Sequence, residues 1–247
     1  MFPLAILIGG PTASGKSDLA FKIHKKIPSL IINADSMQVY DKLQKLTNSP
    51  SVEEIKDSYC KLYNFIKYPL LCDLGVWLKE VTTILKENSK KVPIFVGGTG
   101  LYFKALTDGL VSIPNIPIRF RNQIRALHKS LGQKKFYQKL IKLDPNSKEK
   151  INPTDAQRSI RAYEVKQFTK KSLHDWFQNT KSYFDKDDFF KIYIDYPREE
   201  LIQKIRARTK QMIKMGAINE VRRFLKLKVK KDKSVNKAIG ISEIKEY

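Results

Sequence analysis

The segment that decides the fold is Gly10-Pro11-Thr12-Ala13-Ser14-Gly15-Lys16-Ser17. It matches the pattern GxxxxGK[ST] and lies between an apolar run at Leu4–Ile8 and a stretch of helical character at Lys16–Lys26. In such a strand–loop–helix unit, glycines let backbone N–H groups converge on phosphate oxygens, and the helix N-terminus adds a favourable partial charge. We therefore predict that residues 10–17 bind a diphosphate or a triphosphate.

Within this loop, Lys16 is expected to neutralise the terminal phosphates, and Ser17 is expected to donate its hydroxyl oxygen to a Mg²⁺ cofactor. The loop alone does not name a reaction. Kinases, hydrolysing nucleotidases and transferases whose leaving group is diphosphate all use one.

Three more short apolar runs have the character of buried strands: Leu30–Ile32, Pro93–Val96 and Lys191–Asp195. A helical stretch at Leu74–Lys86 precedes the second of them. Alternating strands and helices predict parallel βαβ units. The expected fold class is therefore α/β, with a P-loop NTPase-like parallel sheet as its core.

Strand signals disappear between about Ser112 and Asp185, which predicts a mostly helical insertion. After a proline-punctuated linker at Ile113–Ile118, helices are expected at Arg119–Leu131 and Asp155–Phe168, the second capped by Thr154 or Asp155. The predicted organisation is a core at residues 1–111, an insertion at 112–185 and a return to the core at 186–247. The last part is expected to contain a helix at 198–216 with a rough apolar stripe (Leu201, Ile205, Met212 and Ile213).

Charge is spread unevenly along the chain, whose formal net charge is +22. Residues 1–111 carry a net charge of +4, residues 112–185 carry +10 and residues 186–247 carry +8. A near-neutral first part followed by a strongly basic remainder indicates a small-molecule site joined to a surface for a polyanion. A general enrichment in lysine is the alternative explanation.

Composition excludes several other classes. No apolar run approaches the roughly 18 residues that a membrane-spanning helix needs, and residues 1–8 have no basic leader before the glycines, so a cytoplasmic protein without a membrane partner is expected. Cys60 and Cys72 are the only cysteines and form no CxxC pair. The three histidines have no metal-binding spacing, which argues against a zinc site.

Polar residues follow the second and third strand runs, where the ligand site of a parallel sheet lies. Asp35 is placed to hold Mg²⁺ or to accept a proton from a nucleophile, or it caps the following helix. In Gly97-Gly98-Thr99-Gly100, Thr99 is placed to hydrogen-bond phosphate oxygens, or the segment is only a tight strand-to-helix turn.

Four motifs occur in order: GPTASGKS, DSMQVY, VGGTGLYFKAL and DAQRSIRAYEV. Together they resemble the tRNA dimethylallyltransferase family (IPP transferases), and the resemblance extends from Leu4 to about Ser242. It implies a P-loop core with a helical insertion, and transfer of a dimethylallyl group from dimethylallyl diphosphate to N6 of adenosine 37 of tRNA. The family's loop is often described as ATP-binding, which reflects its motif.

The resemblance also implies residue roles. Gly10 to Ser17 would bind the donor's diphosphate, with Lys16 and, through Mg²⁺, Ser17 stabilising it as it leaves. Asp35 would be the catalytic carboxylate that takes a proton from the adenine amine, and Thr99 would lie at the reacting centre. Residues matching the family's tRNA contacts are Asp35, Ser36, Met37, Gln38, Thr99, Arg121, Gln157, Arg158, Ser159, Ile160 and Arg161. The expected protein is a monomer that binds the anticodon loop at A36-A37.

For Arg158 and Arg161 the sequence leaves a second interpretation open. They lie three residues apart on one helix face with Asp155 and Glu164, so a surface ladder of salt bridges is possible.

The chain departs from the family pattern at Lys61–Lys67, where histidines are usual, and at Ile241 and Ser242, where an aromatic and a basic residue are usual. A further C-terminal helix of the family is expected to be missing. A small-molecule or nucleotide kinase, a dimethylallyltransferase acting on free AMP or ADP, and a catalytically weak tRNA-binding relative are the alternative functions.

Overall fold

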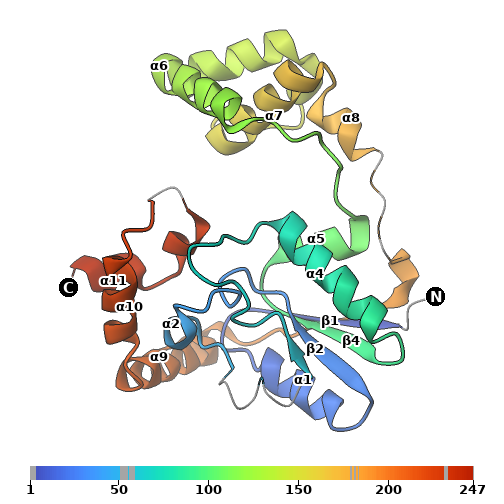
Figure 1. Ribbon diagram of the computed structural model, residues 1–247, viewed down its shortest axis with the longest axis vertical. Helices are drawn as coiled ribbons and strands as arrows, with labels where there is room; N and C mark the ends of the chain where they lie inside the picture. Colours follow the sequence, from blue (N-terminus) through green and yellow to red (C-terminus); the bar gives the residue numbers. More distant parts are fainter. Residues whose placement is uncertain are drawn as a thin grey trace. The chain divides into compact units, whose positions relative to one another are not determined.

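The computed structural model describes residues 4–50, 55, 59–178, 180, 182, 184–230 and 233–246, and its chain forms two compact units (Figure 1). Unit 1 comprises residues 1–107 and 183–247, and unit 2 comprises residues 108–182. From the sequence, the corresponding boundaries were placed after residues 111 and 185.

A parallel five-stranded sheet forms the centre of unit 1, in the order β3-β2-β4-β1-β5. The strands are β1 (Ala5–Gly9), β2 (Ser29–Asn33), β3 (Cys60–Lys61), β4 (Val92–Val96) and β5 (Phe189–Tyr193). Every residue of β2 is buried, as expected for a strand inside a parallel sheet covered on both faces. The α/β prediction with a parallel sheet is confirmed, and β5 pairs with β1 as a late strand of the same sheet.

Helices cover both faces of this sheet (Figure 1). Helix α1 (Lys16–His24) packs on one face, where Ala20 joins Ile8, Ile31 and Ile94 in a buried cluster. Helices α4 (Leu74–Glu87) and α5 (Gly100–Asp108) lie on the other. Trp77 of α4 is fully buried, stacks on Tyr102 of α5 and donates its indole N–H to the carbonyl oxygen of Asn33 at 2.8 Å. This bond ties α4 to the end of β2.

Among its described residues, unit 1 also contains α2 (Gln44–Thr47), α9 (Arg198–Lys214), α10 (Ala217–Lys226) and α11 (Ile241–Glu246). Glu220 of α10 accepts the backbone N–H groups of Lys45 and Leu46 at 3.0 and 2.9 Å, which caps α2 from a distant part of the chain.

Unit 2 consists of α6 (Ile118–Leu143), α7 (Ala156–Thr169) and α8 (Leu173–Phe177) around its own apolar core, which includes Phe136, Leu140 and Val165. Helix α6 is broken at Gly132, whose φ of 70° is outside the helical range. Asp155 is the N-cap of α7 and accepts the backbone N–H of Arg158 at 2.9 Å. The helical character expected for this region is therefore present.

The sequence prediction missed β3, α2, α8, α10 and α11, ended α6 too early at Leu131, and was wrong about one residue of α9. Ile213 was assigned to the apolar stripe, but it is 49% exposed. The partly buried line on this helix instead runs through Leu201, Ile205, Arg208 and Met212. The lysine-rich segment at 226–233 is predicted from its composition to be a solvated loop or a helix end, and its residues 231 and 232 lie outside the described residues. Within the described ranges, no helix combines the length and apolar character needed to cross a bilayer.

Candidate phosphate-binding site

The loop between β1 and α1 has the backbone conformation that its glycines permit. Gly10 and Gly15 have φ values of 151° and 89°, and Ala13 has a φ of 61°. A side chain on Gly10 would place its Cβ 2.8 Å from the carbonyl oxygen of Ile194, so the close approach also requires glycine. Gly15 precedes α1 directly, which puts the loop at the positive end of the helix dipole.

Lys16 is partly buried in this loop and donates to the carbonyl oxygen of Pro11. Burial lowers the pKa of Lys16, Asp35 opposes that shift, and the charge of Arg208 adds to it. The side chain of Ser14 also lines this region, and its hydroxyl oxygen is buried without a hydrogen-bond partner among the described residues. The Lys16 ammonium group and the Ser14 hydroxyl group are therefore suited to bind an anionic oxygen atom of a ligand.

Asp35 follows β2 and is held by local hydrogen bonds. Its backbone N–H donates to Oδ1 of Asn33 at 2.9 Å, and its own Oδ1 accepts the N–H of Met37 at 2.8 Å. Residues 36 and 37 form a bend and residues 38 and 39 a turn, and the next helix begins only at Gln44, so Asp35 stabilises this bend and does not cap a helix. Within the described part of the chain, its Oδ2 makes no hydrogen bond, so this oxygen is available to a substrate.

The end of β4 lies against the end of β2. A Cβ on Gly97 would overlap the carbonyl oxygen of Ala34, so only glycine fits there. Two residues further on, Oγ1 of Thr99 accepts the backbone N–H of Ser36 at 3.1 Å. Thr99 also begins the turn into α5, since its carbonyl oxygen accepts the N–H of Tyr102. It therefore joins the two strand ends while it forms the strand-to-helix turn.

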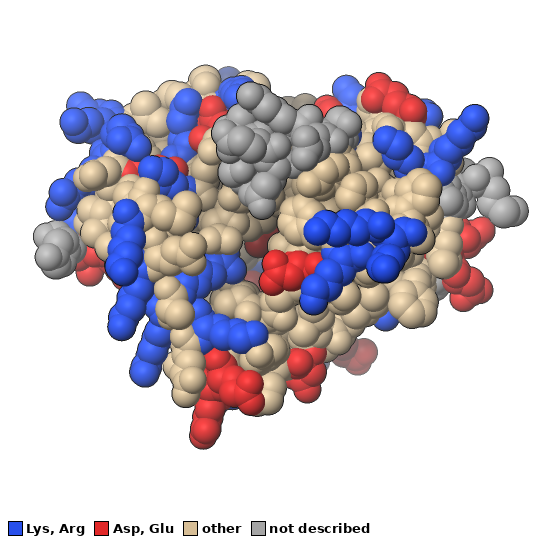
Figure 2. All heavy atoms as spheres, turned by 90° about the horizontal axis from the view of Figure 1, so that it is seen from below, with Lys and Arg blue, Asp and Glu red and all other residues tan. Residues whose placement is uncertain are grey.

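These segments enclose an open cleft of about 510 Å³ in unit 1. Figure 2 looks at the molecule from the side of α1 and α9, where basic side chains gather on both sides of a hollow. The predicted residues that line the cleft are Thr12, Ala13, Ser14, Gly15, Lys16, Ser17, Asp35 and Gln38. Gly10, Pro11, Ser36, Met37 and Thr99 belong to the same loops but do not line it.

Sequence reasoning missed the wall of the cleft that α9 supplies, with Lys204, Arg208 and Gln211. Burial lowers the pKa of Arg208, and the negative charge of Asp35 opposes this, which places the guanidinium group in the electrostatic field of the site. One feature of the sequence indicated this position. Arg208 lies three residues after Ile205 and seven after Leu201, a spacing that puts it on the partly buried face of the helix.

Gln38 and Arg208 meet at the C-terminal end of α2. The Gln38 amide donates to the carbonyl oxygens of Thr47 and Asn48 at 3.0 and 3.2 Å, and Nη2 of Arg208 lies 3.4 Å from the Thr47 oxygen. Thus α2, capped at its other end by Glu220, positions two donors beside the cleft.

The remaining predicted residues lie in unit 2, and their side chains differ in accessibility. Gln157 and Arg158 are exposed, whereas Ser159 is fully buried and donates to the carbonyl oxygen of Asp155 at 2.7 Å. Ile160 packs against the core of unit 2. The side chains of Gln157, Arg158 and Arg161 can therefore contact a ligand at the surface, whereas that of Ser159 cannot.

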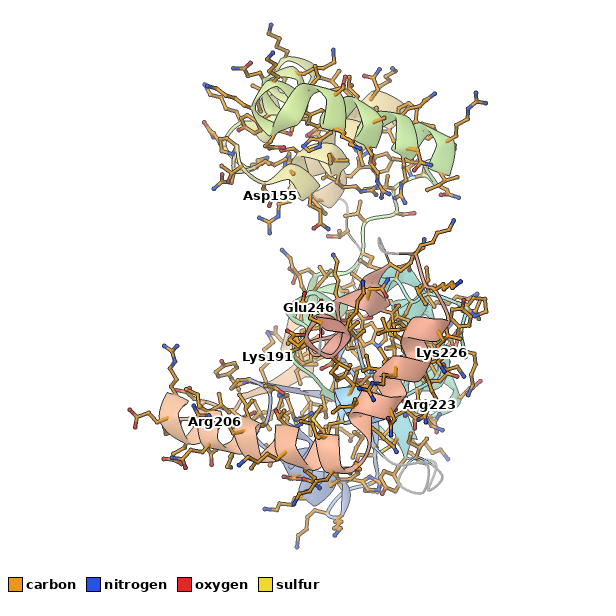
Figure 3. The ribbon with its side chains drawn as sticks, turned by 90° about the vertical axis from the view of Figure 1, so that its left-hand side faces the viewer. Asp155, Lys191, Arg206, Arg223, Lys226 and Glu246 are labelled. Carbon is orange, nitrogen blue, oxygen red and sulfur yellow. The ribbon has the colours of Figure 1, made fainter. Side chains whose placement is uncertain are left out.

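The salt bridges that the sequence allowed among Asp155, Arg158, Arg161 and Glu164 are present along α7. Nε of Arg158 lies 3.5 Å from Oδ2 of Asp155, at the start of the helix (Figure 3). Nη1 of Arg161 lies 3.7 Å from Oε2 of Glu164, and Nε of Arg121 lies 3.7 Å from the same oxygen. These pairs leave Arg158 mostly exposed, so they do not exclude contact with a polyanion.

No three histidine, cysteine, aspartate or glutamate side chains come together as metal ligands anywhere in the described ranges. A divalent ion at the loop would therefore need ligands from the bound phosphates.

Comparisons with a family model and with individual proteins all find transferases that modify tRNA. A family model described as IPP transferase matches residues 38–247. A tRNA dimethylallyltransferase of Pelagibacter ubique is 55% identical over 246 residues, which cover 98% of this chain and 78% of that protein. A tRNA dimethylallyltransferase of Rhizobium johnstonii is 41% identical over 244 residues, covering 97% of this chain and 82% of that protein.

Solved structures agree with these relatives. A tRNA isopentenylpyrophosphate transferase of Staphylococcus epidermidis aligns with a TM-score of 0.62 and 30% identity, covering 98% of this chain and 79% of that one. A eukaryotic dimethylallyltransferase described as acting on tRNA aligns with a TM-score of 0.78 over 93% of this chain. At 24% identity and 57% coverage of that longer chain, the second likeness shows a shared fold.

Proposed function

The chain belongs to the IPP transferase family, and we propose on this basis that it transfers a dimethylallyl group from dimethylallyl diphosphate to N6 of adenosine 37 in tRNA. The observation that carries the proposal is the cleft itself. It brings the loop of residues 10–17 together with Asp35, whose Oδ2 makes no hydrogen bond to any described residue, in one cavity.

Departure of the diphosphate is the first requirement of this reaction. The C–O bond to the allylic carbon breaks, and its electron pair goes to the diphosphate. Lys16 and the backbone N–H groups of residues 12–17 would bind that growing negative charge from one wall, and Arg208 from the other. Because these groups are held in place before the reaction, little reorganisation is needed as the charge develops.

The second requirement is a competent nucleophile. An exocyclic amine is weakly nucleophilic, so a base at its proton helps as the N–C bond forms. Asp35 would accept that proton on Oδ2, because Oδ1 is engaged with the N–H of Met37. The adenine leaves its stack to enter the cleft, which costs a few kcal/mol and less for a loop base than for a base in a duplex.

The residues at the loop fit a Mg²⁺ ion only in combination with the donor. Ser17, Asp18 and Asp35 line the cleft and offer oxygen atoms. Mg²⁺ is commonly bound by one or two protein oxygens together with substrate phosphates and water. When bound, it would add positive charge at the diphosphate; Ser17 would hold it through its hydroxyl oxygen.

The basic surfaces would bind the tRNA backbone. In unit 2 these include Arg121, Arg158 and Arg161; in unit 1, Arg223 and Lys226 lie on α10 (Figure 3). Binding that rests on phosphate contacts weakens steeply with salt. We also propose that the protein works as a cytoplasmic monomer that acts on tRNA, with the loop of residues 10–17, Asp35 and Arg208 lining one cleft of the same chain.

The direct test is a transfer assay. The protein would be incubated with Mg²⁺, labelled dimethylallyl diphosphate and an unmodified tRNA that carries A36-A37, and label would be sought in the RNA. Label at A37 is the expected result. No transfer at any protein concentration, together with phosphoryl transfer from ATP to a nucleotide, would replace the proposal with a kinase activity.

Replacing Arg208 with glutamine should lower kcat/KM for the donor about 30-fold, because one wall of the cleft loses its charge toward the diphosphate. Arg206 on the same helix is exposed and does not line the cleft, so Arg206→Gln is the matched control (Figure 3). Steady-state kinetics with varied donor measure both variants. Equal losses in the two would show that net charge, and not the position of Arg208, is responsible.

A further inference from the structure

Glu164 lies in the middle of α7, is only 3% exposed and has an arginine from each of two helices beside it. Nε of Arg121 in α6 and Nη1 of Arg161 in α7 both lie 3.7 Å from its Oε2. The two arginine side chains are each 36% exposed, so they reach the surface while one carboxylate oxygen holds them.

This arrangement is not an optimised salt bridge. Oε1 of Glu164, Nε of Arg121 and Nη1 of Arg161 are buried and have no hydrogen-bond partner among the described residues. A distance of 3.7 Å is longer than a hydrogen bond, so the pairs do not fully offset the cost of burying the carboxylate. Burial raises the pKa of Glu164, against the effect of Arg121, Arg161 and Arg125.

Without Glu164, the two guanidinium groups would repel each other. Burial lowers the pKa of Arg161, the nearby charge of Arg121 adds to this, and Glu164 opposes it. Among the described residues, the Glu164 carboxylate is the group that favours the placement of these two cations next to each other. Together with Arg125, the group still carries a net charge of +2 when all four side chains are ionised.

We propose that Glu164 is a positioning residue, which holds Arg121 and Arg161 side by side so that their exposed N–H groups receive one phosphate of an RNA backbone. Guanidinium groups suit this role because their planar N–H forks match the oxygens of a phosphate. The inference rests on the proposed function in one respect: the RNA is the tRNA substrate.

The direction in which removal of the Glu164 charge changes the affinity for RNA distinguishes this positioning role from a general effect of net charge. Removing a negative charge from a protein normally strengthens its binding to a polyanion. If Glu164 positions the arginines, its removal instead weakens binding, because the two guanidinium groups separate.

The test compares Glu164→Gln, which keeps the shape of the side chain, with Glu149→Gln. Glu149 is exposed in the same unit and makes no ion pair within the described part of the chain. Fluorescence anisotropy with unmodified tRNA at several salt concentrations gives the affinities. Glu164→Gln should weaken binding about tenfold and make the slope of log K against log salt shallower by about 1, as for one lost phosphate contact. Glu149→Gln should bind as tightly as the parent or more tightly.

A double-mutant cycle distinguishes positioning from general damage to unit 2. If Glu164 acts through Arg121, the variant with both Arg121→Ala and Glu164→Gln should bind no more weakly than Arg121→Ala alone. In transfer assays, Glu164→Gln should raise KM for tRNA and leave kcat within about twofold. Additive losses, or a fall in kcat at saturating tRNA together with a lower melting temperature, would overturn the inference.

Failure of the inference and failure of the proposed function give different results. Glu164→Gln that binds tRNA as tightly as the parent overturns the inference alone, whether or not transfer occurs. A parent protein that binds tRNA in the predicted manner but never transfers label contradicts the proposed function and leaves the role of Glu164 supported. A parent protein that does not bind tRNA contradicts both.

Discussion

Replacement of Asp35 by asparagine is expected to lower the rate of dimethylallyl transfer about 10³-fold, because the variant loses the base that takes the proton of the adenine amine. Asparagine keeps an Oδ1 that can accept the N–H of Met37, so the turn after β2 should survive. The change therefore removes the basic oxygen and little else. Single-turnover transfer with saturating tRNA and donor measures the loss at the chemical step.

Binding of diphosphate provides the control for Asp35→Asn. Asp35 is the negative charge that acts on both Lys16 and Arg208, so its removal should leave the affinity for inorganic diphosphate equal or higher. Isothermal titration calorimetry would measure this affinity. Transfer within about tenfold of the parent, with binding kept, would show that another group or water takes the proton.

The second large effect is expected for Lys16→Met. Methionine has a similar length but no charge, so the departing diphosphate loses a contact that strengthens as negative charge develops, and kcat should fall about 300-fold. Affinity for inorganic diphosphate should fall as well, because the same ammonium group would also contact diphosphate that is bound without any reaction. The two losses are measured by single-turnover transfer and by calorimetry.

Lys22→Met is the matched control for Lys16→Met. Lys22 lies on the same helix, α1, but its side chain is exposed and does not line the cleft. It should change transfer less than about twofold, as expected for a surface charge. Equal behaviour of the two variants would mean that the loop acts through the net charge of unit 1 and not through contact with the diphosphate.

The sequence alone determined the parts of this protein that are local in the chain. The loop of residues 10–17, β1 and α1 form one continuous segment, in which glycines and the apolar run specify the backbone directly. The sequence placed Asp35 and Thr99 near each other for a related reason: each lies within three residues of the end of a buried strand, and in a parallel sheet the strand ends meet at one edge. Elements too short to show a period, such as β3 with two residues, were missed.

Tertiary structure alone decided which distant residues share a site. Arg208 lines the cleft because α9 lies beside the loop of residues 10–17, and its N–H donates to the carbonyl oxygen of Thr47 in α2, a helix whose other end is capped by Glu220. In unit 2, Arg121 and Glu164 are 43 positions apart and meet because α6 packs on α7. Hydrophobic periodicity says which face of a helix is buried but not what that face is buried against, so such pairings depend on how the elements pack.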